Sequence, residues 1–502
     1  MTCDSRVGCT VRRLTRLCLW AVAFGGALAL HADRDMVPPA RRVSWRPGIV
    51  GGVPSVPAAA NVRDHGARGD GVTDDAAAFR AAIAAVRPPG AVAVPAGTYL
   101  LRGPITMRSG VVLRGAGPAQ THLIINHDSP AIDFRLFQRG AWVSVVDGYS
   151  KGSSVLAVSD ASRFVAGGYG EIQQENDPLV MYTRPEWNEP WAEDAVGQVF
   201  RVAAVDGNRL HLDSPLHIDF DPRQHPVVRP QGLLENAGLE DLHIRRADRS
   251  DTGVVRMQNV ANVWIVRVVS ELAARSHVGV DTGYRVEVRD SEFHDATNHG
   301  GGGHGYGVEL NRHTTHALVQ NNIFRRLRHS MMVHVGANGN VFAYNYSREP
   351  MGVSTPADIS VHGHYPFANL FEGNIVQGVA VTDFWGPAGP HNLFFRNRIE
   401  QAGVRLADAS HHQTVVGNEL PRGAIAREAT VDPLTLLIHG NWVDGAVGWD
   451  PGIADRELPD SYYLEAKPDF FGAMEWPSTG SDRPGGTNPA KSRFVGAAAS
   501  GR

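Results

Sequence analysis

Six copies of one short pattern stand in the second half of the chain: Asn322-Ile-Phe, Asn345-Tyr-Ser, Asn374-Ile-Val, Asn397-Arg-Ile, Asn418-Glu-Leu and Asn441-Trp-Val. The asparagines are 23, 29, 23, 21 and 23 residues apart, and Leu242-His-Ile, Arg267-Val-Val and Ser291-Glu-Phe extend the series upstream. Repeats of this length, built from short β-runs, are typical of solenoids whose coils bury their inner faces only by stacking. The sequence therefore predicts an all-β fold, a parallel β-helix (β-solenoid), with asparagine amides stacked from coil to coil.

A second informative stretch precedes the repeats. Asn61-Val-Arg-Asp-His-Gly-Ala-Arg-Gly-Asp-Gly-Val-Thr-Asp-Asp75 leads into a segment in which Phe79, Ile83 and Val86 share one helical face. Together with the repeats, this stretch resembles the N-terminal signature of the pectate lyase/rhamnogalacturonase superfamily, over roughly residues 60–450. The resemblance implies a right-handed parallel β-helix with an N-terminal capping helix. It also implies a secreted enzyme that acts on polysaccharides, in which the acids of this stretch are structural.

The composition bounds the alternatives. The chain has 502 residues, 43% hydrophobic and 20% charged, which excludes disorder of the whole chain. A formal net charge of −4 is unlike that of nucleic-acid-binding proteins, so no nucleic-acid partner is expected.

The expected organisation is a signal peptide (1–32), a linker (33–59), a cap with the first coils (60–137), an inserted β-subdomain (138–220), the repeat coils (221–450) and a tail (451–502) that is disordered from residue 480.

The N-terminus is typical of an export signal. Arginines at positions 6, 12, 13 and 16 precede the apolar run 17–30, and cleavage could follow Ala29 or Ala32. All three cysteines lie within the first eighteen residues, so the processed chain would have neither disulfides nor thiolate ligands. We expect a secreted or periplasmic protein that is not held in a membrane after cleavage. A single-pass anchor is the alternative interpretation, although the apolar run is short for a membrane span.

Alternation along the strands predicts which side chains face outward. Residues two apart share a face and coils stack about 4.8 Å apart, so outward residues of successive coils form columns. The predicted catalytic column is Asp281, Glu309, His334, His362, Asp383 (with Thr382 beside it) and Arg405. Twelve of the 22 histidines lie between His294 and His412, which concentrates titratable groups on these coils. The alternative is a solvated polar face without chemistry.

Two reactions fit this column. β-Elimination on a uronate needs a cation to neutralise the carboxylate, a base and an acid, which Arg405 or Arg328, His334 or His362, and a tyrosine (Tyr306 or Tyr365) would supply. Hydrolysis needs two carboxylates, about 5 Å apart for retention or about 6.5–9.5 Å apart for inversion. Asp281 and Glu309 on adjacent coils are expected near the shorter spacing, whereas Glu309 with Asp358 or Asp383 would be farther apart.

Further residues are expected to bind substrate or ions. Trp187 and Trp191 could stack on sugar rings, or equally could fix their loop to the helix wall. Asp358, His364 and Arg328 are expected beside the column, and His304 in a mobile glycine-rich loop at the groove. His362-Gly-His364, with His334 and Asp383, has a spacing that can hold zinc, but too few ligands are fixed to predict a metal. No cofactor is assigned; Ca²⁺ is left open, although the acid cluster that the resemblance implies for it is not evident.

The sequence thus predicts a polysaccharide-cleaving enzyme, with uronate-containing chains among the candidate substrates. β-Elimination is placed slightly ahead of hydrolysis because histidine and arginine are frequent in the column. A non-catalytic carbohydrate-binding or adhesion solenoid is the alternative class, and epimerisation is a third possibility. Oligomeric state is not predicted.

Overall fold

The computed structural model describes residues 36–181, 184, 187–248, 250–352, 357–382 and 385–499. The predicted signal peptide and Asp383 lie outside these residues. In the described part of the chain, no helix has the length and apolar character needed to cross a membrane.

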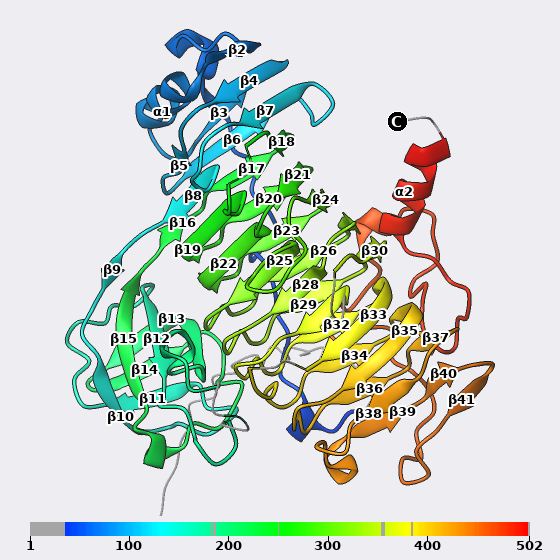
Figure 1. Ribbon diagram of the computed structural model, residues 1–502. Helices are drawn as coiled ribbons and strands as arrows, with labels where there is room; N and C mark the ends of the chain where they lie inside the picture. Colours follow the sequence, from blue (N-terminus) through cyan, green and yellow to red (C-terminus); the bar gives the residue numbers. More distant parts are fainter. Residues whose placement is uncertain are drawn as a thin grey trace, which may run out of the picture. The chain divides into compact units, whose positions relative to one another are not determined.

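The predicted fold class is confirmed: successive turns of chain stack as a parallel β-solenoid (Figure 1). Short strands with buried Val, Ile, Leu and Phe recur once per coil, and each pairs in parallel with the equivalent strand of the next coil. We call the 12-stranded sheet the back sheet. Its strands are β1 (Ala58–Asn61), β3 (Gly90–Val94), β6 (Val111–Gly115), β17 (Gly238–Glu240), β20 (Trp264–Val266), β23 (Glu287–Arg289), β26 (Leu318–Gln320), β29 (Val341–Ala343), β32 (Leu370–Glu372), β34 (Leu393–Phe395), β36 (Thr414–Val416) and β39 (Leu437–His439).

The other coil strands form one 22-stranded sheet with two faces. We call the first face the front sheet: β5 (Ile105–Thr106), β8 (Ile132–Arg135), β16 (Leu234–Glu235), β19 (Val255–Ala261), β22 (Ser276–Tyr284), β25 (Tyr306–Asn311), β28 (His329–Val333), β31 (Ile359–Val361), β33 (Ile375–Val381), β35 (Arg398–Leu406) and β38 (Ile425–Arg427). The second face shares β33 and β35 and adds β2 (Asp70–Asp74), β4 (Gly97–Leu101), β7 (Thr121–Ile125), β18 (His243–Arg246), β21 (Val269–Ala273), β24 (Glu292–Ala296), β27 (Ile323–Arg325), β30 (Tyr346–Arg348), β37 (Glu419–Leu420), β40 (Asn441–Val443) and β41 (Ala446–Gly448).

The interior of the coils is apolar and ordered in columns. Phe342, Phe371 and Phe394 stack on successive back-sheet strands with ring centroids 5.2 and 5.1 Å apart. At a turn, the amide Nδ2 of Asn374 donates to the Oδ1 of Asn397 at 3.0 Å and to the Phe342 carbonyl at 2.8 Å. The same bonds recur from Asn322 through Asn441. Because these buried amides satisfy one another and the turn carbonyls, polar turns can stack inside the core.

A separate antiparallel sheet is inserted between β8 and β16 (Figure 1). We call residues 138–232 the insert; its strands are β9 (Gln138–Arg139), β10 (Val143–Asp147), β11 (Val155–Val158), β12 (Tyr169–Gln173), β13 (Gly197–Asp206), β14 (Arg209–Leu212) and β15 (Val227–Gly232). It rests directly on coil backbone: a Cβ on Gly336 would lie 1.6 Å from the Ala195 carbonyl oxygen, and one on Gly386 would lie 2.0 Å from the Trp187 ring. Close glycine contacts of this kind fix the insert against the coils.

Helix α1 (Ala76–Ala85) covers the first coil with Phe79 and Ile83 buried. The Asp75 carboxylate accepts the backbone N–H groups of Arg68 and Gly69 at 2.7 and 3.0 Å, which gives this acid of the N-terminal stretch a structural role. At the other end of the sequence, α2 (Pro489–Ala499) is helical and buries Ala490 against the second face, so the expected disorder from residue 480 is wrong for this segment.

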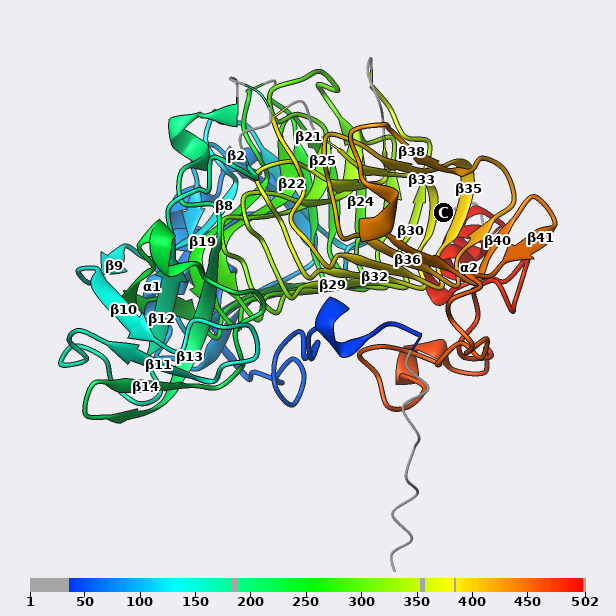
Figure 2. The ribbon, with the colours of Figure 1, turned by 90° about the horizontal axis from the view of Figure 1, so that it is seen from below.

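Two extended segments run along the outer side of the back sheet (Figure 2). We call residues 36–56 the strap and residues 458–486 the tail. In the strap, the Trp45 indole N–H donates to the Ala368 carbonyl at 2.8 Å. In the tail, the backbone N–H of Tyr462 donates to Glu372 at 2.9 Å, and Trp476 donates to the Tyr344 hydroxyl at 2.9 Å. Both segments cover apolar side chains that would otherwise be exposed on the back sheet.

Candidate functional site

The front sheet carries two outward columns where one was predicted. Val278, Val280, Val308 and Leu310 point into the core, so Asp281 and Glu309 face outward as alternation predicts. The register, however, pairs Glu309 with Gly279 and pairs Asp281 with Asn311. The two columns are therefore Gly279, Glu309, Met332, Ser360, Ala380 and Arg405, and, two residues along, Asp281, Asn311, His334, His362 and Thr382.

This register changes the expected spacing of the two carboxylates. Asp281 and Glu309 are one coil apart across the sheet and two residues apart along it. With coils about 4.8 Å apart and a rise of about 3.3 Å per residue, their Cα atoms are about 8 Å apart. Asp281 and Glu309 are therefore diagonal neighbours and not directly opposed, because the pattern of inward and outward residues does not determine the register of adjacent coils.

Both carboxylates have environments that favour the protonated form. Burial raises the pKa of Asp281, against the opposing effects of the Thr282 hydroxyl and the Arg312 guanidinium. Burial also raises the pKa of Glu309, against a hydrogen bond from the Ser276 hydroxyl and the charge of His362. Each side chain is nonetheless half-buried and keeps some surface in contact with solvent.

The insert places an aromatic platform at the carboxyl ends of these strands. Trp191 is 44% exposed, and its ring lies 5.5 Å from His334 and 4.3 Å from His364, centroid to centroid. Arg312 donates to the Trp191 carbonyl at 2.7 Å and is charged beside Asp281 and His334. One cluster thus joins the insert to the column that contains Asp281 and His334.

Three histidines form the floor of the cluster. His334 Nε2 and His364 Nδ1 are 3.0 Å apart, and the His334 and His362 rings lie edge to face at 4.6 Å. Burial, followed by the neighbouring His362 and His364, sets the pKa of His334 well below its usual value, so this imidazole is neutral. Within the residues that the structure describes, no three His, Cys, Asp or Glu side chains are arranged to hold a metal ion.

Three expected substrate-binding residues are buried. Asp358 is fully buried because β31 begins only at Ile359, so alternation does not extend to it. Its carboxylate accepts from the Ser347 hydroxyl at 2.6 Å and from backbone N–H groups, and burial raises its pKa to about 6. Trp187 is also fully buried, stacked 4.1 Å from His364, which is itself buried in a turn. Trp187 therefore fixes its loop, the second of the two roles predicted for it.

Other predicted residues lie away from the cluster. Arg405 is paired with Glu428 on the next coil. Arg328 donates to the Gly300 carbonyl at 3.2 Å and lies over the Tyr306 ring. His304 contacts the Gly301 carbonyl at 2.6 Å and Asp251 at 2.5 Å. The structure does not bring these three residues together with Asp281 and Glu309.

The prediction missed two residues that organise the site. Asn311 lies opposite Asp281 on the next coil, and Arg312 directly follows Asn311 in the sequence. With the correct register, Arg312 would have been predicted to lie near Asp281. Asp408 accepts hydrogen bonds from Thr382 and from Arg184 of the insert, and so ties the insert's loop to the coil. No local sequence signal marks Asp408, because both of its partners are distant in the chain.

The comparisons agree with this architecture. The family description "Rhamnogalacturonase A/epimerase, pectate lyase-like" matches residues 59–166. No curated protein matches the sequence. Among solved structures, the tailspike of Pseudomonas phage phi297 is similar with a TM-score of 0.56 and 13% identity, over 74% of this chain and 71% of that chain.

Two further tailspikes are similar to this chain. That of Pseudomonas phage LKA1 has a TM-score of 0.55 and 16% identity, over 72% of this chain and 63% of that chain. That of Acinetobacter baumannii bacteriophage AP22, solved with a capsular saccharide, has a TM-score of 0.50 and 11% identity, over 72% and 58%. The last two are thus covered over less than two thirds of their length. These identities support the fold alone. The resemblance carried by the Asn61–Val86 stretch is confirmed: residues 59–166 match the rhamnogalacturonase A/epimerase, pectate lyase-like description, and the chain folds as a parallel β-solenoid.

Proposed function

We propose that this protein hydrolyses glycosidic bonds of a polysaccharide with Asp281 and Glu309 as the catalytic pair. The observation that carries the proposal is their diagonal placement: two outward carboxylic acids lie on adjacent coils, two residues apart along the strands, with Cα atoms about 8 Å apart. Inverting glycosidases use two carboxyl groups that are held apart so that a water fits between them. Both groups face outward on the front sheet, where the exposed Trp191 lies beside His334 of the column that contains Asp281.

The roles follow from the environments of the two acids. Burial raises the pKa of the Glu309 carboxyl group, which favours its protonated form, and we assign Glu309 as the general acid. Asp281, beside the Arg312 guanidinium, is the base that activates water. This assignment gives the one protonated and one ionised carboxyl group that acid–base catalysis by two carboxyl groups requires.

The substrate class is a saccharide chain lying along the columns. Trp191 offers an exposed ring on which a sugar face can stack. Half-buried Asn311 and His362, two coils apart in the same column, supply hydrogen-bonding groups. The AP22 tailspike, which shares this fold, is described in complex with a capsular saccharide.

β-Elimination is the second candidate, favoured by one observation. The neutral imidazole of His334 could accept a proton. It ranks second because the arginines expected to neutralise a uronate are engaged elsewhere: Arg405 with Glu428 and Arg328 with a backbone carbonyl. Epimerisation and non-catalytic binding are the remaining alternatives. Neither would shorten the polysaccharide in the assay described below.

We also propose export of the protein, on the basic and apolar segment that precedes residue 33. Expression of the whole chain followed by N-terminal sequencing of the extracellular or periplasmic product tests this step. A new terminus after Ala29 or Ala32 is expected. An unprocessed chain retained in the membrane fraction would favour an anchor.

The reaction is tested by incubating the protein with acidic and neutral polysaccharides and recording reducing ends and ultraviolet absorbance in parallel. Hydrolysis predicts reducing ends without new absorbance. Both signals rising together would establish elimination instead. Altered sugar composition without shorter chains would establish epimerisation, and no change in any polysaccharide would favour a binding solenoid.

A further inference from the structure

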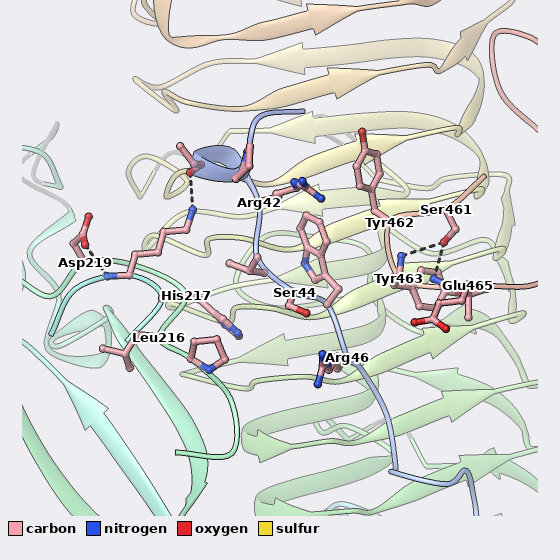
Figure 3. A pocket seen from close by; sticks show the side chains of 18 residues that line it. Arg42, Ser44, Arg46, Leu216, His217, Asp219, Ser461, Tyr462, Tyr463 and Glu465 are labelled. Atoms are coloured by element: carbon pink, nitrogen blue, oxygen red, sulfur yellow. Dashed lines mark hydrogen bonds between the residues drawn. The ribbon is translucent and has the colours of Figure 1, made fainter. Parts of the chain in front are cut away.

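A large pocket opens on the other side of the insert, bounded by the strap, the insert and the tail (Figure 3). Its volume is about 870 Å³, within the range of small-molecule sites. None of the residues that line it belongs to the carboxylate cluster. Its three walls come from residues 39–46, from residues 151–152 and 215–219, and from residues 461–465.

The walls of this pocket are held rigidly. The backbone N–H of Tyr462 is bonded to buried Glu372, and its ring packs 4.7 Å from Phe395 and 6.4 Å from Trp45. The Tyr463 hydroxyl accepts from Gln320 at 2.7 Å. On the insert side, His217 is bonded to Asn338 of the coils at 2.8 Å. A pocket with fixed aromatic walls loses little conformational entropy when a ligand binds.

The charges that line the pocket favour an anion. Arg42 and Arg46 lie on the strap in the middle of the pocket, with Asp219 on one side and Glu465 on the other (Figure 3). The third cation, Lys151, already donates to the Ala40 carbonyl at 2.6 Å, and its backbone N–H is bonded to Asp219. The exposed Arg46 guanidinium is thus placed to meet a ligand carboxylate, with which guanidinium groups make paired hydrogen bonds.

We propose that this pocket is a second, non-catalytic binding site for an acidic saccharide, with Arg46 and Arg42 each binding a sugar carboxylate and Tyr462 contacting a sugar ring. The choice of a saccharide rests on the proposed function, whereas the choice of an acidic ligand rests on the charges of the pocket. Such a site would hold one part of a polymer while another part occupies the front sheet. Two attachment points on one chain raise the effective concentration of substrate at the catalytic site.

The test uses the full chain with D281N and E309Q, so that ligand is bound without being cleaved. Calorimetric titration with a galacturonate hexamer, and with a neutral glucose hexamer, is compared for three added changes: R42Q/R46Q in the pocket, W191A at the front sheet, and R209Q as an exposed control outside both sites. Circular dichroism melting verifies that each variant is folded.

We expect R42Q/R46Q to weaken galacturonate binding at one site about tenfold. Added salt should weaken galacturonate binding at this site in R209Q, and this salt dependence should be lost in R42Q/R46Q. W191A should leave this site intact. Equal affinity in R42Q/R46Q and R209Q, equal binding of the neutral hexamer, or no binding of either sugar would overturn the proposal. The cleavage assay on wild-type protein is a separate readout: cleavage without pocket binding refutes only this inference, and pocket binding without cleavage refutes only the proposed reaction.

Discussion

At the scale of single residues, the proposed mechanism assigns different tasks to Asp281 and Glu309, and each can be removed alone. D281N or E309Q should lower kcat by about 100- to 10,000-fold, the usual contribution of a positioned acid or base. Steady-state kinetics on the polysaccharide identified by the panel measures this effect. E428Q is the matched control, because it removes a carboxylate that pairs with Arg405 away from the site. Equal loss in all three variants would contradict the assignment.

The two tryptophans of the insert's loop should behave differently. W191A removes an exposed ring, so KM should rise roughly three- to tenfold with kcat and Tm little changed. W187A removes a fully buried ring packed on Gly386, so the protein should lose about 3–5 kcal/mol of stability. Kinetics and thermal melting of both variants separate the two roles. A lower Tm in W191A, or an unchanged Tm in W187A, would reverse them.

Alternation along strands predicted the outward direction of Asp281, Glu309 and Arg405 from sequence, because the inward neighbours are apolar at every second position. It failed at Asp358, which precedes its strand and turns inward to Ser347. It also placed Glu309 in the same column as Asp281. The two-residue period of side chains along a strand determines which face a residue lies on. It does not determine which residue lies opposite on the next coil, because a register shift of two residues leaves every side chain on the same face.

At the scale of elements, the docking of the insert depends on glycines in the coils. A Cβ at Gly336 would lie 1.6 Å from the Ala195 carbonyl, and the residue has φ of +68°, which side chains disfavour. G336A should therefore displace the insert's loop and lower both Tm and activity. Hydrogen exchange of residues 187–197 is the direct readout, and faster exchange is expected.

G301A is the matched control for this change, because nothing lies within 4 Å of the added Cβ and no positive φ is required there. It should leave hydrogen exchange and Tm unchanged. Similar exchange in G336A and wild-type protein would mean that the insert does not depend on this contact.

The coil period was readable from sequence because each coil contacts its neighbours at a nearly constant spacing. The attachment of the insert was not, since Arg312 meets Trp191 and Asp408 meets Arg184 through pairings that no local pattern encodes. Helix α2 was missed for a related reason. Its contacts, such as Lys491 with Glu400, are made only after the coils have formed.

At the scale of the whole molecule, the tail is joined to the back sheet through a buried acid that titrates near neutrality. Glu372 accepts hydrogen bonds from Tyr344 and from the backbone of Tyr462, and burial raises its pKa to about 7. The folded state therefore holds a proton that the unfolded chain releases at lower pH. Stability should fall as pH rises from about 4.5 to about 7, by roughly 1.4 kcal/mol per pH unit from this group, and then level off.

Thermal melting of wild-type protein and E372Q across this pH range tests the effect. Glutamine does not titrate, so the Tm of E372Q should decline less than that of wild-type protein over the same window. Asp358, with its pKa raised to about 6, adds a decline of the same sign to both proteins and cancels in the difference. Parallel pH profiles for the two proteins would contradict the role of Glu372.

The most direct test of the central claim, hydrolysis by a diagonal carboxylate pair, is the anomeric configuration of the first product. Proton NMR of the reaction on the polysaccharide identified by the panel, recorded before mutarotation, resolves it. The spacing of Asp281 and Glu309 predicts inversion at the cleaved carbon. Retention of configuration would contradict the assignment of Asp281 and Glu309 as an inverting acid and base, and an unsaturated product would contradict hydrolysis itself.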